Sequence, residues 1–352
     1  MPDIVRQFML QGNPTYCERY GNGHINETYL LKTDAPHAYI LQKINQRVFR
    51  DVDALMGNIS AVTRYLAKKD ADPRHVLTIV PTLDGATCAR DEAGECWRVY
   101  EFVTHSVCLD RAESADDFYQ SAVAFGRFQN MLADFPAHTL SETIARFHDT
   151  PSRYAALHAA MQADEKGRLG EVKPELDFVL AREAEAATLM MLLAKGELPL
   201  RVTHNDTKLN NVMLDEAERT PLCVIDLDTV MPGLVANDFG DSIRFGASTA
   251  LEDEKELDKV TLSLPLYETF SRGFVSLCGE RLTPLEKETL PMGAKLMTLE
   301  CGVRFLTDYL QGDVYFSIHR PEHNLDRCRT QFKLVADMEH KWDEMRTIIE
   351  RV

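Results

Sequence analysis

Several features are missing from this sequence of 352 residues, and each absence narrows what the protein can be. No apolar run is as long as a membrane-spanning helix, which needs about 18 residues. The first residues lack the basic start and the apolar stretch of a secretory signal. The eight cysteines stand singly without a CxxC pair, so we expect reduced, buried thiols rather than disulfides or a metal site. We therefore expect a cytoplasmic protein with no membrane partner.

Positive charge is also scarce. Lysine and arginine total 39 against 55 aspartates and glutamates, which gives a formal net charge of −16. Because nucleic-acid-binding proteins neutralise phosphates with basic side chains, this balance disfavours nucleic acid as a partner. We expect a small-molecule partner instead, bound by a monomer or a simple homo-oligomer.

The sequence does have 45% apolar residues, enough for a compact core, and two regions that differ in predicted secondary structure. Short β-branched or aromatic runs, which predict strands, lie at 29–31, 38–41, 77–80 and 97–103. Apolar residues at helical spacings predict helices at 51–68, 116–132, 173–195, 255–277 and 284–311. We therefore expect an α+β fold, with a small antiparallel-sheet lobe at 1–103 and a mostly helical lobe at 104–352. The run of mixed charge at 251–259 is predicted to be a solvated helix face.

Polar residues gather in one loop of a strand-and-turn segment at 201–246. The stretch 203–211 reads Thr-His-Asn-Asp-Thr-Lys-Leu-Asn-Asn, and an apolar run then ends at Asp226. Phosphoryl transfer from ATP needs a group that accepts or orients the hydroxyl proton, oxygen ligands for Mg²⁺ and a cation near the phosphates. Asp206 fits the first role, Asn211 and Asp226 fit the second, and Lys208 fits the third. The alternative is a polar loop whose carboxylates are merely solvated.

The spacing of these residues resembles that of a known superfamily. His204-x-Asp206-x₄-Asn211, followed by Ile225-Asp226, is similar to the catalytic loop and metal aspartate of the protein-kinase-like fold, in the form shared by aminoglycoside phosphotransferases and choline kinases. The resemblance implies a bilobal kinase-like fold with Asp206 as the catalytic base. It also implies that Asn211 and Asp226 hold Mg²⁺ and that His204 is a structural residue of the loop.

A second motif in the same segment matches a kinase motif in its residues but not in its position. The tripeptide Asp238-Phe239-Gly240 repeats the DFG of kinases but lies 32 residues after Asp206, whereas Asp226 already stands at the matching distance after an apolar strand. We therefore expect Asp238 to brace the catalytic loop from the start of a helix. Simple capping of that helix is the alternative.

The N-terminal lobe is expected to bind the nucleotide. A glycine-bearing turn at 20–29 contains Gly21, Gly23, Asn26 and Thr28, and its backbone N–H groups are placed to cover ATP phosphates. A GxG turn by itself is structurally ordinary, so a plain hairpin turn is the alternative.

The phosphate-binding cation and the adenine contact are further expectations. Lys43 is the candidate for the cation, although related enzymes often have Lys or Arg where Gln42 stands, and a shift of one residue changes the face of a strand. Its helix partner would be Asp51 or Asp53. The backbone from Glu101 to Val103 is expected to hydrogen-bond adenine, with an ordinary buried edge strand as the alternative.

A finer resemblance concerns the acceptor. Nearly the whole chain is similar to the bacterial N-acetylhexosamine 1-kinases, which phosphorylate N-acetylglucosamine and N-acetylgalactosamine at the anomeric hydroxyl. The stretches that carry this likeness are 23–29, 40–45, 203–211, 225–233 and 304–316. A sugar pocket needs fixed donors and acceptors plus an aromatic or apolar wall. Besides Asp206, the candidates for sugar contacts are Asp228, Arg244, Arg304, Asp308 and Tyr315. A surface salt bridge beside core aromatics is the alternative for the last three.

Two other functions remain open. One is another alcohol kinase of the same fold, of aminoglycoside, choline or homoserine type, whose cationic acceptors would favour an acidic or aromatic pocket. The other is a catalytically inactive kinase-like protein that senses nucleotide or serves as a scaffold. The presence of Asp206, Lys208, Asn211 and Asp226 argues against the second.

Overall fold

The computed structural model describes residues 2–21 and 25–352, and the chain forms two compact units that interleave along the sequence. The first unit comprises Met1–Cys108, Asp134–Ala145 and Asn211–Pro232, and the second comprises Leu109–Ala133, Arg146–Asn210 and Gly233–Val352. The first unit is built on antiparallel sheet and the second is mostly helical, which confirms the predicted α+β fold. The lobe boundary at 103/104 stays a prediction.

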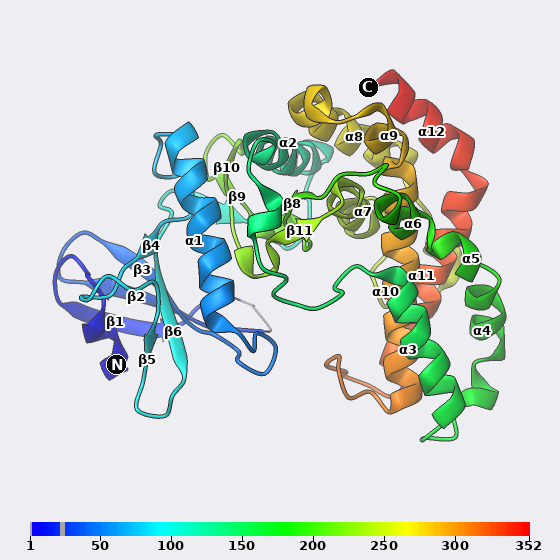
Figure 1. The fold of residues 1–352 in the computed structure, drawn as a ribbon, viewed down its shortest axis with the longest axis horizontal. Coiled ribbons are helices and arrows are strands. Elements are labelled where there is room, and N and C mark those ends of the chain that lie inside the picture. The colour runs from blue at the N-terminus through cyan, green and yellow to red at the C-terminus, as the bar shows by residue number, and fades with distance from the viewer. Residues whose placement is uncertain (1, 22–24) are drawn as a thin grey trace. The chain divides into compact units, whose positions relative to one another are not determined.

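One antiparallel sheet organises the first unit (Figure 1). Its strands follow the order β1-β2-β3-β6-β4, and β5 pairs with β6. The bounds are β1 Pro14–Arg19, β2 Glu27–Thr33, β3 Ala38–Lys43, β4 Ile79–Val80, β5 Ala89–Arg90 and β6 Cys96–Glu101. Gln42 lies opposite Thr28 on one side and opposite Arg98 on the other. Directly opposed residues share a face, so these three side chains project from the same side of the sheet.

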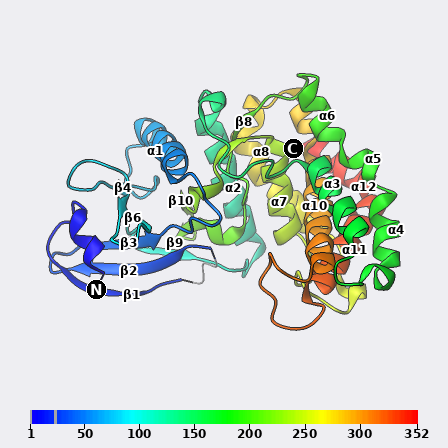
Figure 2. The same ribbon diagram turned by 60° about the horizontal axis from the view of Figure 1, so that its bottom comes forward.

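The two faces of this sheet have different neighbours. One face contributes Leu31, Tyr39 and Leu41 to a buried apolar cluster that also includes residues of the 3-10 helix η1 (Asp3–Gln7). Helix α1 (Val52–Lys69) lies over the opposite face (Figure 2), where Arg98 Nη1 is 3.9 Å from Met56 Sδ. Strand alternation therefore separates an apolar face from a face that carries polar side chains.

Helix α1 confirms the helix predicted at 51–68. Asp51 caps it by accepting a hydrogen bond from the backbone N–H of Ala54 at 2.9 Å. Asn58 accepts from the Ser141 N–H at 2.9 Å and donates to the Val230 carbonyl oxygen at 3.0 Å. The helix is thus attached to the chain segment that follows Asp226.

A second, three-stranded sheet of order β10-β9-β7 completes the first unit. Its strands are β7 Ser106–Cys108, β9 Val212–Asp215 and β10 Pro221–Val224. The 3-10 helix η5 (Leu227–Thr229) follows β10, and Asp226 lies between them. This hairpin therefore carries both predicted metal ligands at its ends.

The second unit is a helical assembly centred on α10, which contacts α3, α7 and α11 (Figure 1). The helices are α2 Ala115–Leu132, α3 Thr150–Ala163, α4 Lys173–Leu180, α5 Glu183–Ala186, α6 Thr188–Ala194, α7 Val235–Gly246, α8 Leu264–Cys278, α9 Pro284–Glu288, α10 Leu290–Gln311, α11 His323–His340 and α12 Trp342–Arg351. Strand β8 (Arg201–Thr203) leads into the polar loop, and β11 (Met231–Gly233) crosses the boundary between the units. Leu299, Val303 and Leu306 of α10 lie in its buried core.

Helices α7 and α10 approach each other closely at glycines. A Cβ atom on Gly293 would overlap the carbonyl oxygen of Ala236, and one on Gly240 would overlap the carbonyl oxygen of Gly293. Only glycine fits at these two positions without moving a backbone. The position of α7, which borders the polar loop, is therefore set by backbone contact with α10.

One predicted helix begins later than expected and another is interrupted, each at a proline. The helix predicted at 255–277 begins only at Leu264, with Pro265 in the first turn of α8. The helix predicted at 284–311 begins at Pro284 as expected but is divided into α9 and α10, with Pro291 in the first turn of α10. Proline has no backbone N–H and disfavours helical conformation in the residue before it, so a helix starts rather than continues there. The helix predicted at 173–195 is divided into α4, α5 and α6, and α3, α11 and α12 have no counterpart among the predicted elements.

The prediction for the charged run at 251–259 is wrong. The segment contains turns and the 3-10 helix η6 (Leu257–Lys259) rather than one helix face. Glu252 accepts a hydrogen bond from Arg244 Nη1 at 2.7 Å, and Asp253 accepts one from Arg320 at 2.9 Å. These carboxylates are therefore part of the packing of the second unit.

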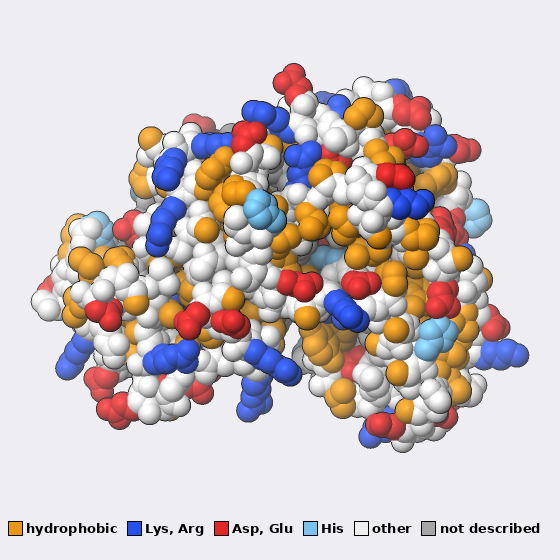
Figure 3. All heavy atoms as spheres, viewed as in Figure 1, with side chains coloured by type: hydrophobic (Ala, Val, Ile, Leu, Met, Phe, Trp, Pro, Cys, Tyr) orange, Lys and Arg blue, Asp and Glu red, His pale blue; other side chains and the backbone are white. Residues whose placement is uncertain are grey.

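Charged side chains of both signs are interspersed over the face shown in Figure 3. Searched over the described residues, none of the helices combines the length and the apolar character that a membrane-spanning segment requires.

Candidate active site

One buried carboxylate fixes the loop that follows β8. Asp238, in the first turn of α7, accepts hydrogen bonds from the backbone N–H groups of His204 at 2.9 Å and Asn205 at 2.8 Å, and from Gln129 Nε2 at 2.7 Å. Asp238 is 1% exposed, and burial raises its pKa although these donors oppose the shift. The predicted bracing role of Asp238 is confirmed.

His204 is a structural residue of the same loop, as predicted. Its ring is fully buried and makes edge contacts with Phe125 and Phe128. Its Nδ1 accepts a hydrogen bond from the Asp206 N–H at 3.3 Å. Between these two residues, Asn205 adopts a left-handed backbone with φ of 64°, which asparagine tolerates better than most residues. The loop thus turns sharply just before Asp206.

Asp206 and Lys208 form an ion pair on the partly exposed side of the loop. Lys208 Nζ lies 2.8 Å from Asp206 Oδ1, and the side chains are 34% and 27% exposed. The negative charge of Asp206 raises the pKa of Lys208 above its usual range, so the ammonium stays charged at neutral pH. The pair therefore offers a carboxylate acceptor and a fixed cation at one solvent-accessible point.

Helix α7 also fixes the residue between the members of this pair. The Thr207 N–H donates to Asp241 Oδ2 at 3.0 Å, and Ser242 Oγ donates to the Thr207 carbonyl oxygen at 2.8 Å. Asp241 in turn accepts a hydrogen bond from Arg244 Nη2 at 2.9 Å. Side chains spaced along one helix therefore determine the conformation of the loop from 204 to 208.

The structure reveals a further support of the loop that the sequence analysis missed. His148 Nε2 bonds to the Asn205 carbonyl oxygen at 3.1 Å, while its Nδ1 bonds to Glu300 at 3.0 Å, and Thr150 donates to Glu300 at 2.7 Å. Burial alone would raise the pKa of Glu300, but the hydrogen bond and charge of His148, with nearby arginines, outweigh burial and lower it. No local motif marks His148, because its partners lie far away in sequence.

The first unit places both predicted metal ligands at one end of the β9–β10 hairpin. Val212 pairs with Val224, and the Ile225 N–H donates to the Asn211 carbonyl oxygen at 2.9 Å. Asn211 directly precedes β9, and Asp226 follows β10 with a left-handed φ of 57°. Among the described residues no group of three His, Cys, Asp or Glu side chains is arranged for a metal. An amide and a carboxylate oxygen suit Mg²⁺, which commonly takes its other ligands from phosphates and water.

A buried network surrounds Asp228, two residues further on. Arg98 Nη1 and Nη2 both bond to the Asp228 carboxylate, the second at 2.9 Å, and Asn26 Nδ2 donates to the same carboxylate at 2.5 Å. Arg98 and Asp228 are 1% and 3% exposed. Burial alone would lower the pKa of Arg98, but the charges of Asp228 and Asp226 help raise it, so the guanidinium stays charged. A contact between Asp228 and sugar stays a prediction.

The predicted nucleotide residues of the N-terminal turn have the following positions. Gly21 has a φ of 73°, in the left-handed region that favours glycine, and Gly23 lies outside the described residues. Asn26 bonds to Asp228 and accepts from the Asn45 N–H at 3.0 Å. Thr28 Oγ1 accepts from Gln42 Nε2 at 3.0 Å. Their contact with ATP stays a prediction.

Lys43 lies on the face of the sheet opposite Gln42. The predicted adenine contact lies at the end of β6. Lys43 Nζ is 3.3 Å from Glu95 and 3.8 Å from Glu27, on the face opposite Gln42. At the end of β6, the Glu101 N–H donates to the Thr78 carbonyl oxygen at 2.9 Å, and the Val103 carbonyl oxygen accepts from Ser106 at 2.6 Å.

Arg304 lies among aromatic rings near the C-terminal half of α10. Its guanidinium carbon is 5.4 Å from the ring centre of Phe316, 5.6 Å from that of Phe147 and 5.8 Å from that of Tyr315. Tyr315 is 66% exposed. Phe147 directly precedes His148, and His148 bonds to the carbonyl oxygen of Asn205. The aromatic cluster is therefore connected through His148 to the residue that precedes Asp206.

Asp308 organises the loop that carries Tyr315. Its carboxylate accepts hydrogen bonds from the backbone N–H groups of Val314 at 2.9 Å, Tyr315 at 2.8 Å and Phe316 at 3.0 Å. Asn324 Nδ2 donates to it at 2.8 Å. The side chain is 2% exposed, so the structure supports a role in shaping the aromatic cluster rather than a direct contact.

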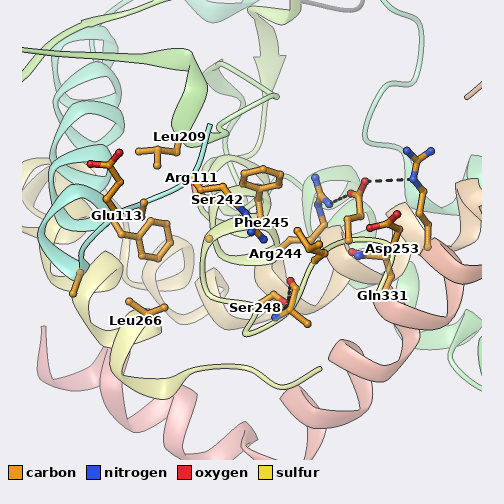
Figure 4. Close-up of a pocket in the computed structure, with 18 of the residues that line it drawn as sticks. Arg111, Glu113, Leu209, Ser242, Arg244, Phe245, Ser248, Asp253, Leu266 and Gln331 are labelled. Atoms are coloured by element: carbon orange, nitrogen blue, oxygen red, sulfur yellow. Dashed lines mark hydrogen bonds and ion pairs between the residues drawn. The ribbon is translucent and has the colours of Figure 1, made fainter. Parts of the chain in front are cut away.

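Arg244, the remaining sugar candidate, lines a cavity of about 630 Å³ in the second unit (Figure 4). Its guanidinium is held by Asp241 and Glu252. Leu209 and Ser242 also line the cavity, which therefore borders the polar loop on the side of α7.

Known proteins resemble this chain in sequence and in fold. A model of the phosphotransferase enzyme family matches residues 17–259. An aminoglycoside phosphotransferase from Alicyclobacillus acidocaldarius superimposes with a TM-score of 0.66 and 12% identity, covering 100% of this chain and 97% of its own. A microcompartment-associated aminopropanol kinase has a TM-score of 0.57 and 18% identity, with 97% and 96% covered. The amicoumacin kinase hAmiN, solved with AMP-PNP and Ca²⁺, has a TM-score of 0.59 and 16% identity, with 99% and 91% covered.

The solved structures are less than 25% identical to this chain, so they show the fold alone. The family model spans more than half of the sequence and includes the loop with Asp206 and the hairpin with Asp226. The chain therefore belongs to the phosphotransferase enzyme family and is a small-molecule kinase with an alcohol acceptor.

Proposed function

We propose that the protein transfers the γ-phosphoryl group of Mg·ATP to the anomeric hydroxyl of N-acetylglucosamine or N-acetylgalactosamine, giving the sugar 1-phosphate. The observation that supports kinase activity is the ion pair of Asp206 and Lys208, on a loop whose backbone is hydrogen-bonded to Asp238. The observation that supports an uncharged acceptor is the position of the Arg304 guanidinium among three aromatic rings.

In the proposed reaction, the acceptor oxygen forms a bond to the γ-phosphorus while the bond from that phosphorus to the β,γ-bridging oxygen breaks and ADP leaves. Asp206 accepts or orients the hydroxyl proton. Lys208, at 2.8 Å from Asp206, holds that carboxylate and stabilises negative charge on the transferring group. Mg²⁺ held by Asn211 and Asp226 would supply charge neutralisation on the phosphates. A covalent phosphoenzyme is not expected.

The arginine inside the aromatic cluster favours a neutral acceptor over a cationic one. A sugar ring packs its apolar face on aromatic side chains and presents hydroxyls to fixed donors, and Phe147, Tyr315 and Arg304 supply both features. A cationic acceptor would be repelled by the positively charged Arg304 guanidinium. The charge of Arg304 therefore favours the sugar over cationic alcohols such as choline, the main alternative within the family.

Turnover of a panel of acceptors tests the proposal. ADP release would be measured with Mg·ATP and N-acetylglucosamine, N-acetylgalactosamine, choline, homoserine or an aminoglycoside. The position of the new phosphate would be read from phosphorus coupling in the NMR spectrum of the product. We expect turnover of the two sugars and coupling at the anomeric carbon.

A matched pair of variants tests the acceptor site. Arg304→Met is expected to raise the KM for the sugar while the KM for ATP stays unchanged, because Arg304 belongs to the aromatic cluster. Arg272→Met removes an exposed arginine of α8 and serves as the control. Turnover of amines alone would retain the kinase and reject the sugar, and nucleotide binding without turnover of any acceptor would support a sensor instead.

A further inference from the structure

A buried arginine lies across the sheet from Gln42 of β3, which directly precedes Lys43, the residue expected to supply the phosphate-binding cation. The partner of Gln42 across the β3–β6 ladder is Arg98. Arg98 Nε and Nη2 both donate to Gln42 Oε1, at 3.0 and 2.9 Å. The positive charge on this face of the sheet therefore belongs to β6, whereas Lys43 faces the other side and pairs with Glu27 and Glu95.

The other side of the Arg98 guanidinium faces Asp228 in a two-point contact. Such bidentate pairing fixes relative orientation as well as distance. Asp228 lies in η5, whose preceding residue is Asp226. Asn26 bonds to the same carboxylate at 2.5 Å, and Thr143 donates to the Asp228 carbonyl oxygen at 3.3 Å. Asp228 is thus the residue through which the sheet is bonded to the segment after β10.

We propose that Arg98 is a positioning residue for the divalent metal: through Asp228 it fixes the short segment that carries Asp226 against the β3–β6 ladder. The inference rests on the proposed function, in which Asp226 holds Mg²⁺. Residues behind a metal ligand orient it, and their loss weakens metal affinity even though they never touch the ion. Gln42 and Asn26 act with Arg98, since they bond to its guanidinium and to Asp228 respectively.

The left-handed backbone of Asp226 makes such support necessary. Its φ of 57° is uncommon for a residue other than glycine and persists only where the surroundings enforce it. Bonds from Arg98 and Asn26 to Asp228, and from α1 to Val230, hold the chain immediately after it. Without the Arg98 contact, we expect Asp226 to sample other conformations and to bind the metal less tightly.

The test compares variants of this pair. Arg98→Met leaves the Asp228 charge buried and unpaired and is at risk of misfolding, so Arg98→Met/Asp228→Leu replaces both partners with apolar groups and serves as the foldable variant. Arg98→Lys keeps the charge but loses the two-point contact. Arg90→Met, which removes an exposed arginine of neighbouring β5, is the control. Circular dichroism and the melting temperature establish that each variant is folded.

Two readouts are measured for each folded variant: calorimetric affinity for AMP-PNP with and without Mg²⁺, and the Mg²⁺ concentration that gives half-maximal turnover. We expect the double variant to lose about 10- to 100-fold in the Mg²⁺-dependent readouts, with metal-free nucleotide affinity near wild type and a smaller loss for Arg98→Lys. A folded double variant with wild-type Mg²⁺ dependence would overturn the inference and leave the kinase standing. A wild-type protein that neither binds nucleotide nor turns over ATP would instead reject the proposed function itself.

Discussion

Lys208 supplies a single positive charge beside Asp206, the proposed catalytic carboxylate. Its ammonium lies 2.8 Å from Asp206, and its raised pKa keeps it charged at neutral pH. Lys208→Met should lower kcat by about 10²- to 10³-fold, because a preorganised charge at the reacting group is lost. Steady-state kinetics with Mg·ATP and the sugar measure this effect. Lys195→Met, at an exposed position beyond α6, should keep wild-type kcat, and an equal loss in both variants would argue against a specific role for Lys208.

His148 is a residue that supports the loop and that no pattern in the sequence singles out. It bridges Glu300 and the Asn205 carbonyl oxygen, immediately before Asp206. His148→Ala should reduce kcat by up to about 10²-fold, because small displacements of a catalytic group are costly. The matched control is His158→Ala, since the His158 side chain is 47% exposed on α3. If His148→Ala turned over at the wild-type rate, support of the loop by this residue would be excluded.

Helix α7 is the element that holds the loop from 204 to 208, and its close approach to α10 requires glycines. A Cβ on Gly293 would overlap the Ala236 carbonyl oxygen of α7. Gly293→Ala should therefore destabilise the protein by about 1–3 kcal/mol and also reduce kcat, because α7 carries Asp238 and Asp241. Urea unfolding and kinetics measure both effects.

Gly57 of α1 is the matched control for that substitution. It is exposed, and a Cβ there would meet no atom within 4 Å. Gly57→Ala should stabilise the protein by about 0.5–1 kcal/mol, because alanine has less conformational freedom to lose in a helix. Destabilisation by Gly57→Ala, or none by Gly293→Ala, would contradict the close approach of α7 and α10.

The elements that the sequence predicted correctly are those with strong local signals. Helix α1 has a capping aspartate and a continuous apolar stripe, and the role of Asp238 followed from motif spacing. Helix α11 is rich in polar residues, several of them buried through long-range partners, so its periodicity is weak. The pairing of Arg98 with Asp228 spans 130 residues, and no local pattern encodes it. Contacts of this kind appear only once the chain is folded.

At the scale of the whole molecule, ion pairs join elements that lie far apart in the sequence. Glu339 of α11 binds Arg182 at 2.6 Å, between α4 and α5, and Lys295 of α10 at 3.1 Å. Burial would raise the pKa of Glu339, but these donors and their charges outweigh burial and lower the pKa below its ordinary value of 4.5. The stabilisation is therefore present above pH 4.5 and is lost as the pH falls through the lower folded-state pKa.

Glu339→Gln tests this linkage. It should reduce the free energy of unfolding by about 1 kcal/mol at neutral pH, and the difference from wild type should shrink as the pH falls below 4.5. Urea unfolding at several pH values measures it, with the exposed Glu344→Gln as the control. A difference that does not depend on pH would show that the charge of Glu339 is not responsible.

Asp206 is the proposed catalytic carboxylate of the whole molecule, so replacing it gives the most direct test. ADP release with Mg·ATP and N-acetylglucosamine, together with nucleotide affinity, would be measured for wild type and for Asp206→Asn. The account predicts a kcat about 10²- to 10⁴-fold lower in the variant, because the general base is lost, and nearly unchanged affinity for Mg·ATP. Wild-type turnover by Asp206→Asn would contradict the assignment of Asp206 as the catalytic carboxylate.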